Sequence, residues 1–166
     1  DRLRGKRLGV AAFVRFPLRL LTFQQLQRIS SALGSAELIR RREKLSGASF
    51  SMGYFVGRGT TPNSIDSDTH ARFKTSGPDE RFRRVYVCPF CGSSTRVAYD
   101  ESNKILEHRC TSDECPGGRK RLPIYVVDDD IYRFLPTVVV STVDKLAQFG
   151  HNRRFPQLFG RFDMVC

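Results

Sequence analysis

The chain has 166 residues, 40% of them hydrophobic, which is enough for one domain with a sizeable core and a small appended module. No run approaches the roughly 18 apolar residues of a membrane span, so we expect a soluble, cytoplasmic protein with no membrane partner. The formal net charge is +11, carried mostly by arginine, whose planar group can bind phosphate oxygens in pairs. This charge indicates either a nucleic-acid surface or a solvated face.

The first elements predicted along the chain are a strand, a helix and a second strand. LGVAAFVRF (8–16) is rich in branched and aromatic residues and is stopped by Pro17. From about Leu20 to Lys44, apolar residues recur every three or four positions, as on a helix. Thr22 and Gln25 have capping-box spacing, so this helix begins at Thr22 or earlier, just after Pro17. SFSMGYFVG (49–57) predicts the second strand, and Ile65 to Phe82 a loop.

Four cysteines in two close pairs predict a metal site: Cys88, Cys91, Cys110 and Cys115. Two pairs separated by 18 residues can fold back as a hairpin and surround a structural zinc ion with four thiolates. We therefore expect a zinc ribbon over about Val85 to Leu122, with short strands at VYV, RVAYD and KILEHR.

Other roles for these cysteines and their neighbours stay open. The cysteines could form disulfides instead, although the sequence shows no oxidising context. His108 could replace one cysteine as a ligand, support the ligands from outside, or face solvent. Cys166 ends an apolar run and is expected to be an inert buried thiol.

After the ribbon, the sequence predicts a return to the main sheet. PIYVV is an extended entry, Asp128 to Asp130 open a short helix, Thr137 to Val140 form a buried strand, and a helix begins at Ser141 or Thr142. The final RFDMVC (161–166) is typical of a buried strand cut at its end, so we expect a piece of a longer protein. The alternation predicts an α/β fold, with a parallel sheet covered by helices.

Three elements in order resemble superfamily 2 helicases. FPLRLLTFQQLQRI is similar to the element after the first post-nucleotide strand, GTTPN to the next turn, and PTVVVSTVDKLAQF to a later strand-to-helix junction. RFDMVC resembles the strand leading into the Walker B box. Together with the ribbon, LPIYVVDDDIYRFLPTVVVSTVDKLA most resembles the large helicase of the DISARM anti-phage defence systems of bacteria.

The resemblance implies a RecA-like motor lobe in two parts, residues 1–82 and 123–166, interrupted by the ribbon at 83–122. It implies an ATP-dependent helicase or translocase that acts on nucleic acid, with DNA favoured over RNA, and that has companion defence subunits. ATP and Mg²⁺ would be bound by the full-length protein only. No glycine-rich lysine loop appears before Leu8 and no Asp-Glu pair follows Cys166, and these are the parts that hold ATP and Mg²⁺, so this piece alone should be inactive and has no catalytic residue.

Residue roles follow from the matched positions. Ligands of parallel sheets gather where strands end and helices begin, so phosphates of nucleic acid are expected to contact residues at these junctions. The expected contacts are Arg19, Thr22, Gln25, Thr60, Thr61, Ser141, Thr142 and Lys145. Thr22, Ser141 and Thr142 could instead be helix caps alone, and Lys145 a solvated side chain.

The ribbon has three open roles: it could extend the nucleic-acid track, bind a partner subunit, or act as a structural staple. Its basic residues are Arg96, Arg109, Arg119, Lys120 and Arg121. Two other functions compete with the motor. One is a zinc-ribbon nucleic-acid-binding or adaptor protein without motor activity, and the other, disfavoured, is a nuclease using Asp128 to Asp130.

Overall fold

The computed structural model of the chain describes residues 10–17, 19–56, 61–118, 121–147 and 153–160. In chain order, the elements are β1 (Ala12–Phe16), α1 (Arg19–Arg42), β2 (Met52–Phe55), α2 (Ser67–Ser76), η2 (Glu80–Phe82), β3 (Thr95–Asp100), β4 (Ile105–Cys110), β5 (Ile124–Tyr125), α3 (Asp128–Phe134), β6 (Val138–Thr142), α4 (Val143–Ala147) and η4 (Phe155–Phe159). None of the helices in these ranges is long and apolar enough to cross a membrane.

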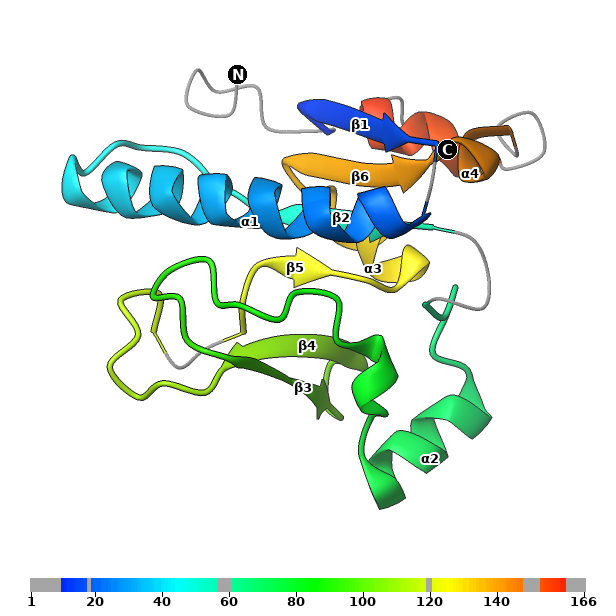
Figure 1. The fold of residues 1–166 in the computed structure, drawn as a ribbon. Helices are drawn as coiled ribbons and strands as arrows, with labels where there is room; N and C mark the ends of the chain where they lie inside the picture. Colours follow the sequence, from blue (N-terminus) through cyan, green and yellow to red (C-terminus); the bar gives the residue numbers. More distant parts are fainter. Residues whose placement is uncertain (1–9, 18, 57–60, 119–120, 148–152, 161–166) are drawn as a thin grey trace.

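The main sheet has four parallel strands in the order β1-β6-β2-β5. Val138 lies opposite Ala12 on one side and opposite Met52 on the other, so strands from both ends of the chain meet in register. Figure 1 shows α1 running along this sheet, with the ribbon hairpin β3–β4 beyond β5. The predicted α/β architecture with a parallel sheet is therefore confirmed.

Alternating side chains divide the sheet between two cores. Met52, Tyr54 and Val140 pack with Leu26 of α1. Phe55 and Val139, one position along each strand, point to the other face and pack with α3 and η4. Because both faces of these strands are covered, β2 and the first three residues of β6 are apolar, as expected for a parallel sheet.

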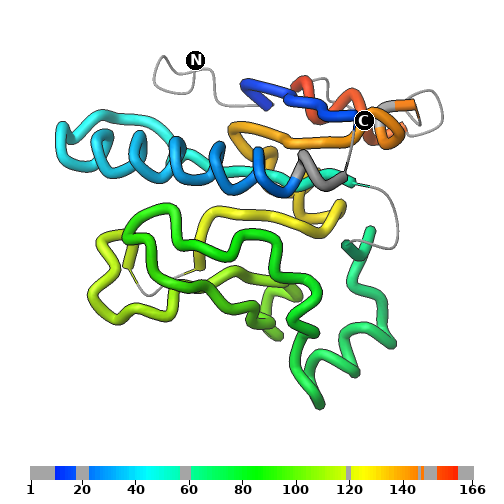
Figure 2. Tube along the Cα trace, viewed as in Figure 1, coloured from blue at the N-terminus to red at the C-terminus, as the bar shows by residue number. Residues whose placement is uncertain are grey.

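After β2 the chain leaves the sheet, forms α2, η2 and the ribbon, and returns to the sheet at β5 (Figure 2). Its strands β3 and β4 pair antiparallel, from Thr95 opposite Cys110 to Asp100 opposite Ile105. Leu106 and Leu122 of the ribbon are buried in the same core as Leu26 of α1. The ribbon is therefore built into the core beneath α1 and is not only tethered to it.

The loop predicted for Ile65 to Phe82 is wrong, because this segment forms α2 and η2. Asp66 caps α2 by accepting a 2.8 Å hydrogen bond from the Thr69 amide. Phe73 is the one buried residue of α2, and its ring lies edge-on to the rings of Phe82 and Tyr99. A helix anchored by a single aromatic residue has no apolar period, which is why the sequence pattern missed it.

Several predicted boundaries also shift. The first helix begins at Arg19 rather than Thr22, in agreement with the earlier start considered. The last strand continues through Ser141 and Thr142, and its helix begins at Val143. VYV does not form a regular strand, since only Val87 makes an isolated bridge, to Ser94. The strand expected at 161–166 lies outside the described residues.

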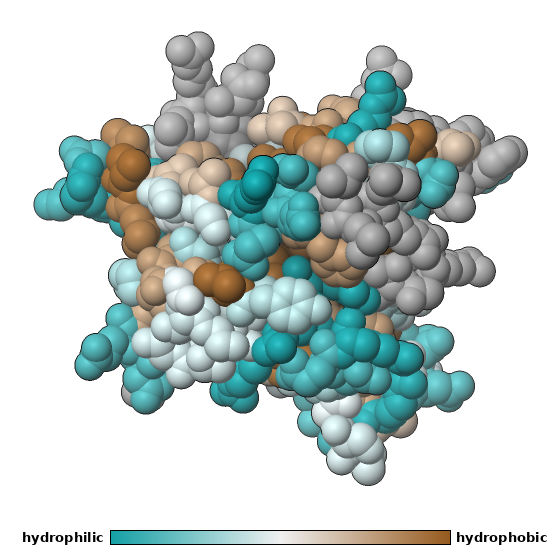
Figure 3. Space-filling model, viewed as in Figure 1, coloured by the Kyte–Doolittle hydropathy of each residue, from teal (hydrophilic) through white to brown (hydrophobic). Residues whose placement is uncertain are grey.

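The face that carries α1 mixes hydrophilic and hydrophobic side chains (Figure 3). The large exposed apolar residues of the described chain include Ile39 of α1, which is 49% exposed, and Tyr86 in the segment after η2, which is 51% exposed. This segment passes along the same side of the molecule as α1 in Figure 1.

Candidate metal centre and nucleic-acid edge

The four cysteines of the two predicted pairs come together in the structure. The Sγ atoms of Cys88, Cys91, Cys110 and Cys115 all lie within 4.8 Å of one another. The closest pairs, Cys88 with Cys115 and Cys91 with Cys110, are 3.6 and 3.5 Å apart. A tetrahedral zinc ion with Zn–S bonds of about 2.3 Å places its sulfur atoms roughly 3.8 Å apart. The four thiols therefore have the chemistry and the spacing of a structural zinc site.

Two tight turns hold the cysteine pairs in place. In the first, the Cys88 amide donates to the Ser93 carbonyl at 2.7 Å and the Gly92 amide donates to the Cys88 carbonyl at 3.0 Å. Gly92 has a φ of 78°, in the left-handed region that favours glycine. The second pair is supported by the Ser112 amide, which donates to Cys110 Sγ at 3.3 Å.

Without a cation, the environment does not favour four thiolates equally. Burial raises the pKa of the Cys88 and Cys115 thiols above the usual range. The Ser93 side chain lowers the pKa of Cys91 to about 6. Thiolates crowded this closely repel one another, whereas a bound cation deprotonates coordinating thiols outright. The donor set therefore fits a divalent, thiophilic metal such as zinc.

The structure bears on the disulfide alternative for the four cysteines and on the role of His108. All four cysteines are free, and their sulfur separations are far beyond the roughly 2.05 Å of a disulfide. His108 does not face solvent: it is fully buried, and its Nε2 accepts a 3.0 Å hydrogen bond from the Arg84 amide. Burial, with Arg84 and Arg83 nearby, lowers the pKa of His108 to about 4, so this histidine is neutral. Cys166 lies outside the described residues.

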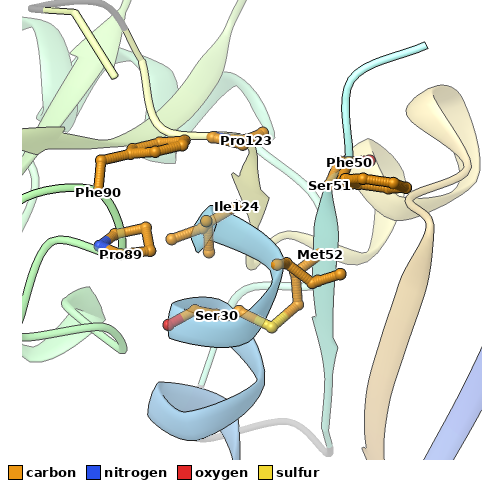
Figure 4. A pocket seen from close by; sticks show the side chains of 10 residues that line it. Ser30, Phe50, Ser51, Met52, Pro89, Phe90, Pro123 and Ile124 are labelled. Atoms are coloured by element: carbon orange, nitrogen blue, oxygen red, sulfur yellow. The ribbon is translucent and has the colours of Figure 1, made fainter. Parts of the chain in front are cut away.

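The first cysteine turn packs directly on α1. A Cβ atom on Gly34 would lie 2.3 Å from the Pro89 carbonyl oxygen, so only glycine permits this approach. Beside the contact is a small, largely apolar cleft, in which Figure 4 shows Pro89, Phe90 and Pro123. Its two hydroxyl groups, from Ser30 and Ser51, already bond backbone groups. The cleft is therefore part of the packing interface between the ribbon and the main sheet with α1.

A glutamine side chain joins the two parts next to this interface. Gln27 Oε1 accepts hydrogen bonds from the Tyr86 and Val87 amides, both at 3.1 Å. Its Nε2 donates to the Val87 carbonyl at 2.9 Å. Gln27 acts here as an additional strand partner for the ribbon. Sequence reasoning missed it because nothing in a helical period predicts contacts 59 or 60 residues away.

Three predicted nucleic-acid contacts are buried where β6 ends. Ser141 and Thr142 are 0% and 1% exposed, and the Ser141 hydroxyl donates to the Thr142 carbonyl at 3.1 Å. Lys145 is 7% exposed, so the solvated alternative is wrong. Its Nζ lies 2.5 Å from Asp128 Oδ2 and 4.6 Å from the centre of the Phe55 ring. Burial raises the pKa of Asp128 to about 6 although Lys145 opposes this shift.

The remaining predicted contacts divide between described and undescribed residues. Gln25 lies half-buried in the second turn of α1. Thr61 is 3% exposed, and its hydroxyl has no hydrogen-bond partner within the described structure. The turn of Thr61 meets the start of α3, where the Asp129 amide donates to the Asn63 carbonyl at 3.0 Å. The side chains of Arg19 and Thr22, and all of Thr60, lie outside the described residues.

The arginines expected to stud the ribbon are largely engaged within it. Arg109 and Arg121 both contact the buried Glu107, at 2.7 and 4.0 Å. Arg121 also lies over the rings of Tyr125 and Phe134. Arg96 is exposed on β3, and Arg119 and Lys120 lie outside the described residues. The hairpin arginines that the structure describes therefore stabilise the ribbon more than they charge its surface.

Within the described parts of the chain, the four cysteines are the one group of three or more potential metal ligands that comes together. Asp128 to Asp130 open α3 as predicted, but they do not gather with further ligands. A nuclease centre built on these aspartates therefore has no support among the described residues.

Comparison with known proteins gives one informative relative. No family model matches the chain. The chain is 34% identical, over 172 aligned positions, to the DISARM protein DrmA of Bacillus paralicheniformis. The match covers 95% of this chain but 15% of DrmA, so the chain spans a small part of that relative's length. Over nearly its whole length, the chain is thus related to a DISARM protein.

Proposed function

We propose that the chain is part of a nucleic-acid-dependent ATPase of the superfamily 2 helicase type, acting in bacterial anti-phage defence. In this proposal the parallel sheet belongs to the first RecA-like motor lobe, and the zinc ribbon is inserted into it. The relation to a DISARM protein supports the defence role. The chain's own part is to contact the phosphate backbone of a nucleic acid, with DNA favoured.

The observation that carries the proposal is the strand order. β1, β6 and β2 are parallel neighbours, so their carboxyl ends share one edge of the sheet. The three segments that resemble helicase elements follow these same three strands: FPLRLLTFQQ after β1, GTTPN after β2, and α4 after β6. Segments more than a hundred residues apart in sequence thereby supply one candidate phosphate-binding edge.

Residues at this edge have different proposed roles. Arg19, Thr22 and Gln25 at the start of α1 would contact one phosphate through side chains and free amides. Thr60 and Thr61 would contact the next through the turn after β2. Ser141 and Thr142 are buried, so they would not contact the nucleic acid directly. They would act on it by shaping the start of α4. Lys145 would contact a phosphate only after leaving Asp128.

ATP and Mg²⁺ are assigned to other parts of the full-length protein. The 166 residues carry no glycine-rich lysine loop, and their three Asp-Glu pairs, Asp79-Glu80, Asp100-Glu101 and Asp113-Glu114, do not follow a strand of the parallel sheet, as a Walker B box would. ATP hydrolysis is therefore a property to test in the longer protein, and nucleic-acid binding is the property to test in this chain.

The test is binding of the zinc-loaded chain to labelled single-stranded and duplex DNA across a salt series. We expect affinity to fall steeply with salt. Arg19→Ala should weaken binding and lower the salt slope by about one. Arg96→Ala, which removes an exposed arginine of the ribbon, is the matched control and should have little effect.

Two results would overturn the proposal. One is the absence of salt-dependent binding to either DNA. The other is binding that Arg19→Ala leaves unchanged but that is lost when zinc is removed from an otherwise folded sheet. The second result would place the activity in the ribbon and support the adaptor alternative.

A further inference from the structure

We propose that Tyr86 is a stacking platform for a base of single-stranded nucleic acid, flanked by arginines that contact the adjoining phosphates. This inference rests on the proposed function, because it extends the nucleic-acid track from the start of α1 onto the segment between η2 and Cys88. Four features carry it: the exposure of Tyr86, its bracing, its charged surroundings and its position.

Tyr86 is exposed although it is large and aromatic. Its exposed fraction is 51%, and that of the adjoining Val87 is 42%. One side of the Tyr86 ring is covered by the guanidinium of Arg83, whose Cζ lies 4.9 Å from the ring centre. About half of the side-chain surface thus remains open to a flat partner. Bases stack on such rings with little sequence preference, because each base has an aromatic face.

The backbone of Tyr86 is held in place by hydrogen bonds to α1 on one side and to β3 on the other. The Tyr86 amide donates to Gln27 of α1 at 3.1 Å, and the Tyr86 carbonyl accepts from the Thr95 amide of β3 at 3.1 Å. Arg83 is itself fixed, because it donates to the Thr95 carbonyl at 2.9 Å and lies 3.2 Å from a Glu80 carboxylate oxygen. A rigid aromatic side chain loses little conformational entropy on binding.

The neighbouring charges suit a phosphate backbone. Arg81 is 62% exposed and pairs at 3.2 Å with Asp79, which is also exposed. Arg83, which is 28% exposed, pairs with Glu80, and the side chains of Asp79 and Glu80 are 53% and 62% exposed. The exposed Arg81–Asp79 pair contributes at most about 1 kcal/mol, so a phosphate oxygen can replace the Asp79 carboxylate. A nucleic acid is favoured over a protein partner because the chain has a net charge of +11.

The platform lies beside the proposed phosphate edge. The guanidinium of Arg84, two residues before Tyr86, packs 5.0 Å from the ring centre of Phe23. Phe23 belongs to the first turns of α1, directly after the predicted contacts Arg19 and Thr22. A strand bound at the carboxyl edge would therefore reach Arg84 and Tyr86 next.

The sequence contains no tryptophan, so Tyr86→Trp creates a unique fluorescent reporter. We expect a single-stranded oligodeoxynucleotide to quench this fluorescence, as base stacking does. Ile39→Trp, at a similarly exposed position of α1, is the control and should not be quenched. In unlabelled protein, Tyr86→Ala should weaken binding to a dye-labelled oligonucleotide roughly 5- to 150-fold, whereas Tyr86→Phe should retain it.

The outcomes separate this inference from the proposed function. If the labelled oligonucleotide binds and Arg19→Ala weakens it, but Tyr86→Ala has no effect and Tyr86→Trp is not quenched, the platform is wrong and the phosphate edge stands. Equal quenching of Tyr86→Trp and Ile39→Trp would also overturn the platform. If no oligonucleotide binds, both proposals fail.

Discussion

The ribbon and the parallel sheet reach their folded forms by different means. In the ribbon, two cysteine pairs and a hairpin with partners 5 to 15 residues apart supply most of the order. In the sheet, β1 pairs with β6, whose residues lie 126 positions further along the chain, as in Ala12 opposite Val138. Local spacing thus determines the ribbon, whereas the sheet depends on burying both faces of strands that are distant in sequence. Gly34 and Gln27 connect the two.

Among the changes that test this difference between ribbon and sheet, loss of the metal should lower stability most. Structural zinc supplies much of the folding free energy of small metal-binding modules, so Cys110→Ser should abolish tight zinc binding and unfold the ribbon. Because the ribbon shares its core with α1, the melting temperature of the whole chain should also fall. Zinc content by mass spectrometry and thermal unfolding by circular dichroism measure both effects.

The control is Cys166→Ser, outside the two pairs, which should bind zinc normally. An unchanged melt for the sheet would show that the two parts fold independently.

The contact between the two parts is tested next by Gly34→Ala. In a free helix this change stabilises by up to about 1 kcal/mol. Here the new Cβ would lie 2.3 Å from the Pro89 carbonyl oxygen, and we expect a loss of about 3 kcal/mol in the free energy of unfolding. Chemical denaturation measures the difference, with the exposed neighbour Ser35→Ala as the control. A stabilised Gly34→Ala variant would mean that the ribbon does not pack on α1 in this way.

On the sheet side, Glu37 should make the stability of the chain fall with acid below pH 4.5. Glu37 is 1% exposed and binds Arg40, Arg41 and the Phe50 amide. The hydrogen bond from Arg40, then that from Arg41, lowers its pKa from 4.5 to about 2 despite burial. The stabilisation is therefore complete above pH 4.5 and is lost as the pH falls towards 2. Glu37→Gln should cost about 2 kcal/mol at pH 7 and remove this part of the acid dependence.

Unfolding free energies of both proteins from pH 2 to pH 7 measure the effect. Glu43→Gln, at an exposed position paired with Arg42, is the control and should change stability little. Parallel pH curves for Glu37→Gln and the parent protein would contradict the assignment.

The smallest expected effect is a gain in stability, from Asp130→Asn. Asp130 is 5% exposed, and its Oδ2 atom has no hydrogen-bond partner in the described structure. Burial raises its pKa from 3.8 to about 6, so the ionised form costs stability as the pH rises through this window. Asp130→Asn should gain about 1 to 2 kcal/mol at pH 7.5 and nothing below pH 3.5.

Thermal unfolding at the two pH values measures this gain. The control is Asp129→Asn, because Asp129 is about half exposed and pairs with Arg154. Destabilisation of Asp130→Asn at pH 7.5 would show that the Asp130 carboxylate has a stabilising partner.

The sequence predicted the features that depend on local spacing and missed those that depend on contacts between distant segments. The spacing of the four cysteines was sufficient for the metal site, because all four ligands lie within 28 residues of one another. Periodicity predicted α1 and the parallel strands, because their buried faces are apolar. It could not predict α2, whose one buried side chain leaves no period, or the Asp128–Lys145 pair, which depends on where α3 and α4 meet. Nor does a charge count reveal that Glu107 neutralises ribbon arginines.

The central claim is that the nucleic acid binds at the carboxyl edge of the parallel sheet. Hydrogen exchange of the zinc-loaded chain, with and without a single-stranded oligonucleotide, tests it most directly. The account predicts slower exchange in residues 19–25, 61–63 and 84–87, with the β3–β4 hairpin unchanged. Protection confined to the hairpin, from Thr95 to Cys110, would contradict the motor-lobe account and favour a ribbon that binds nucleic acid by itself.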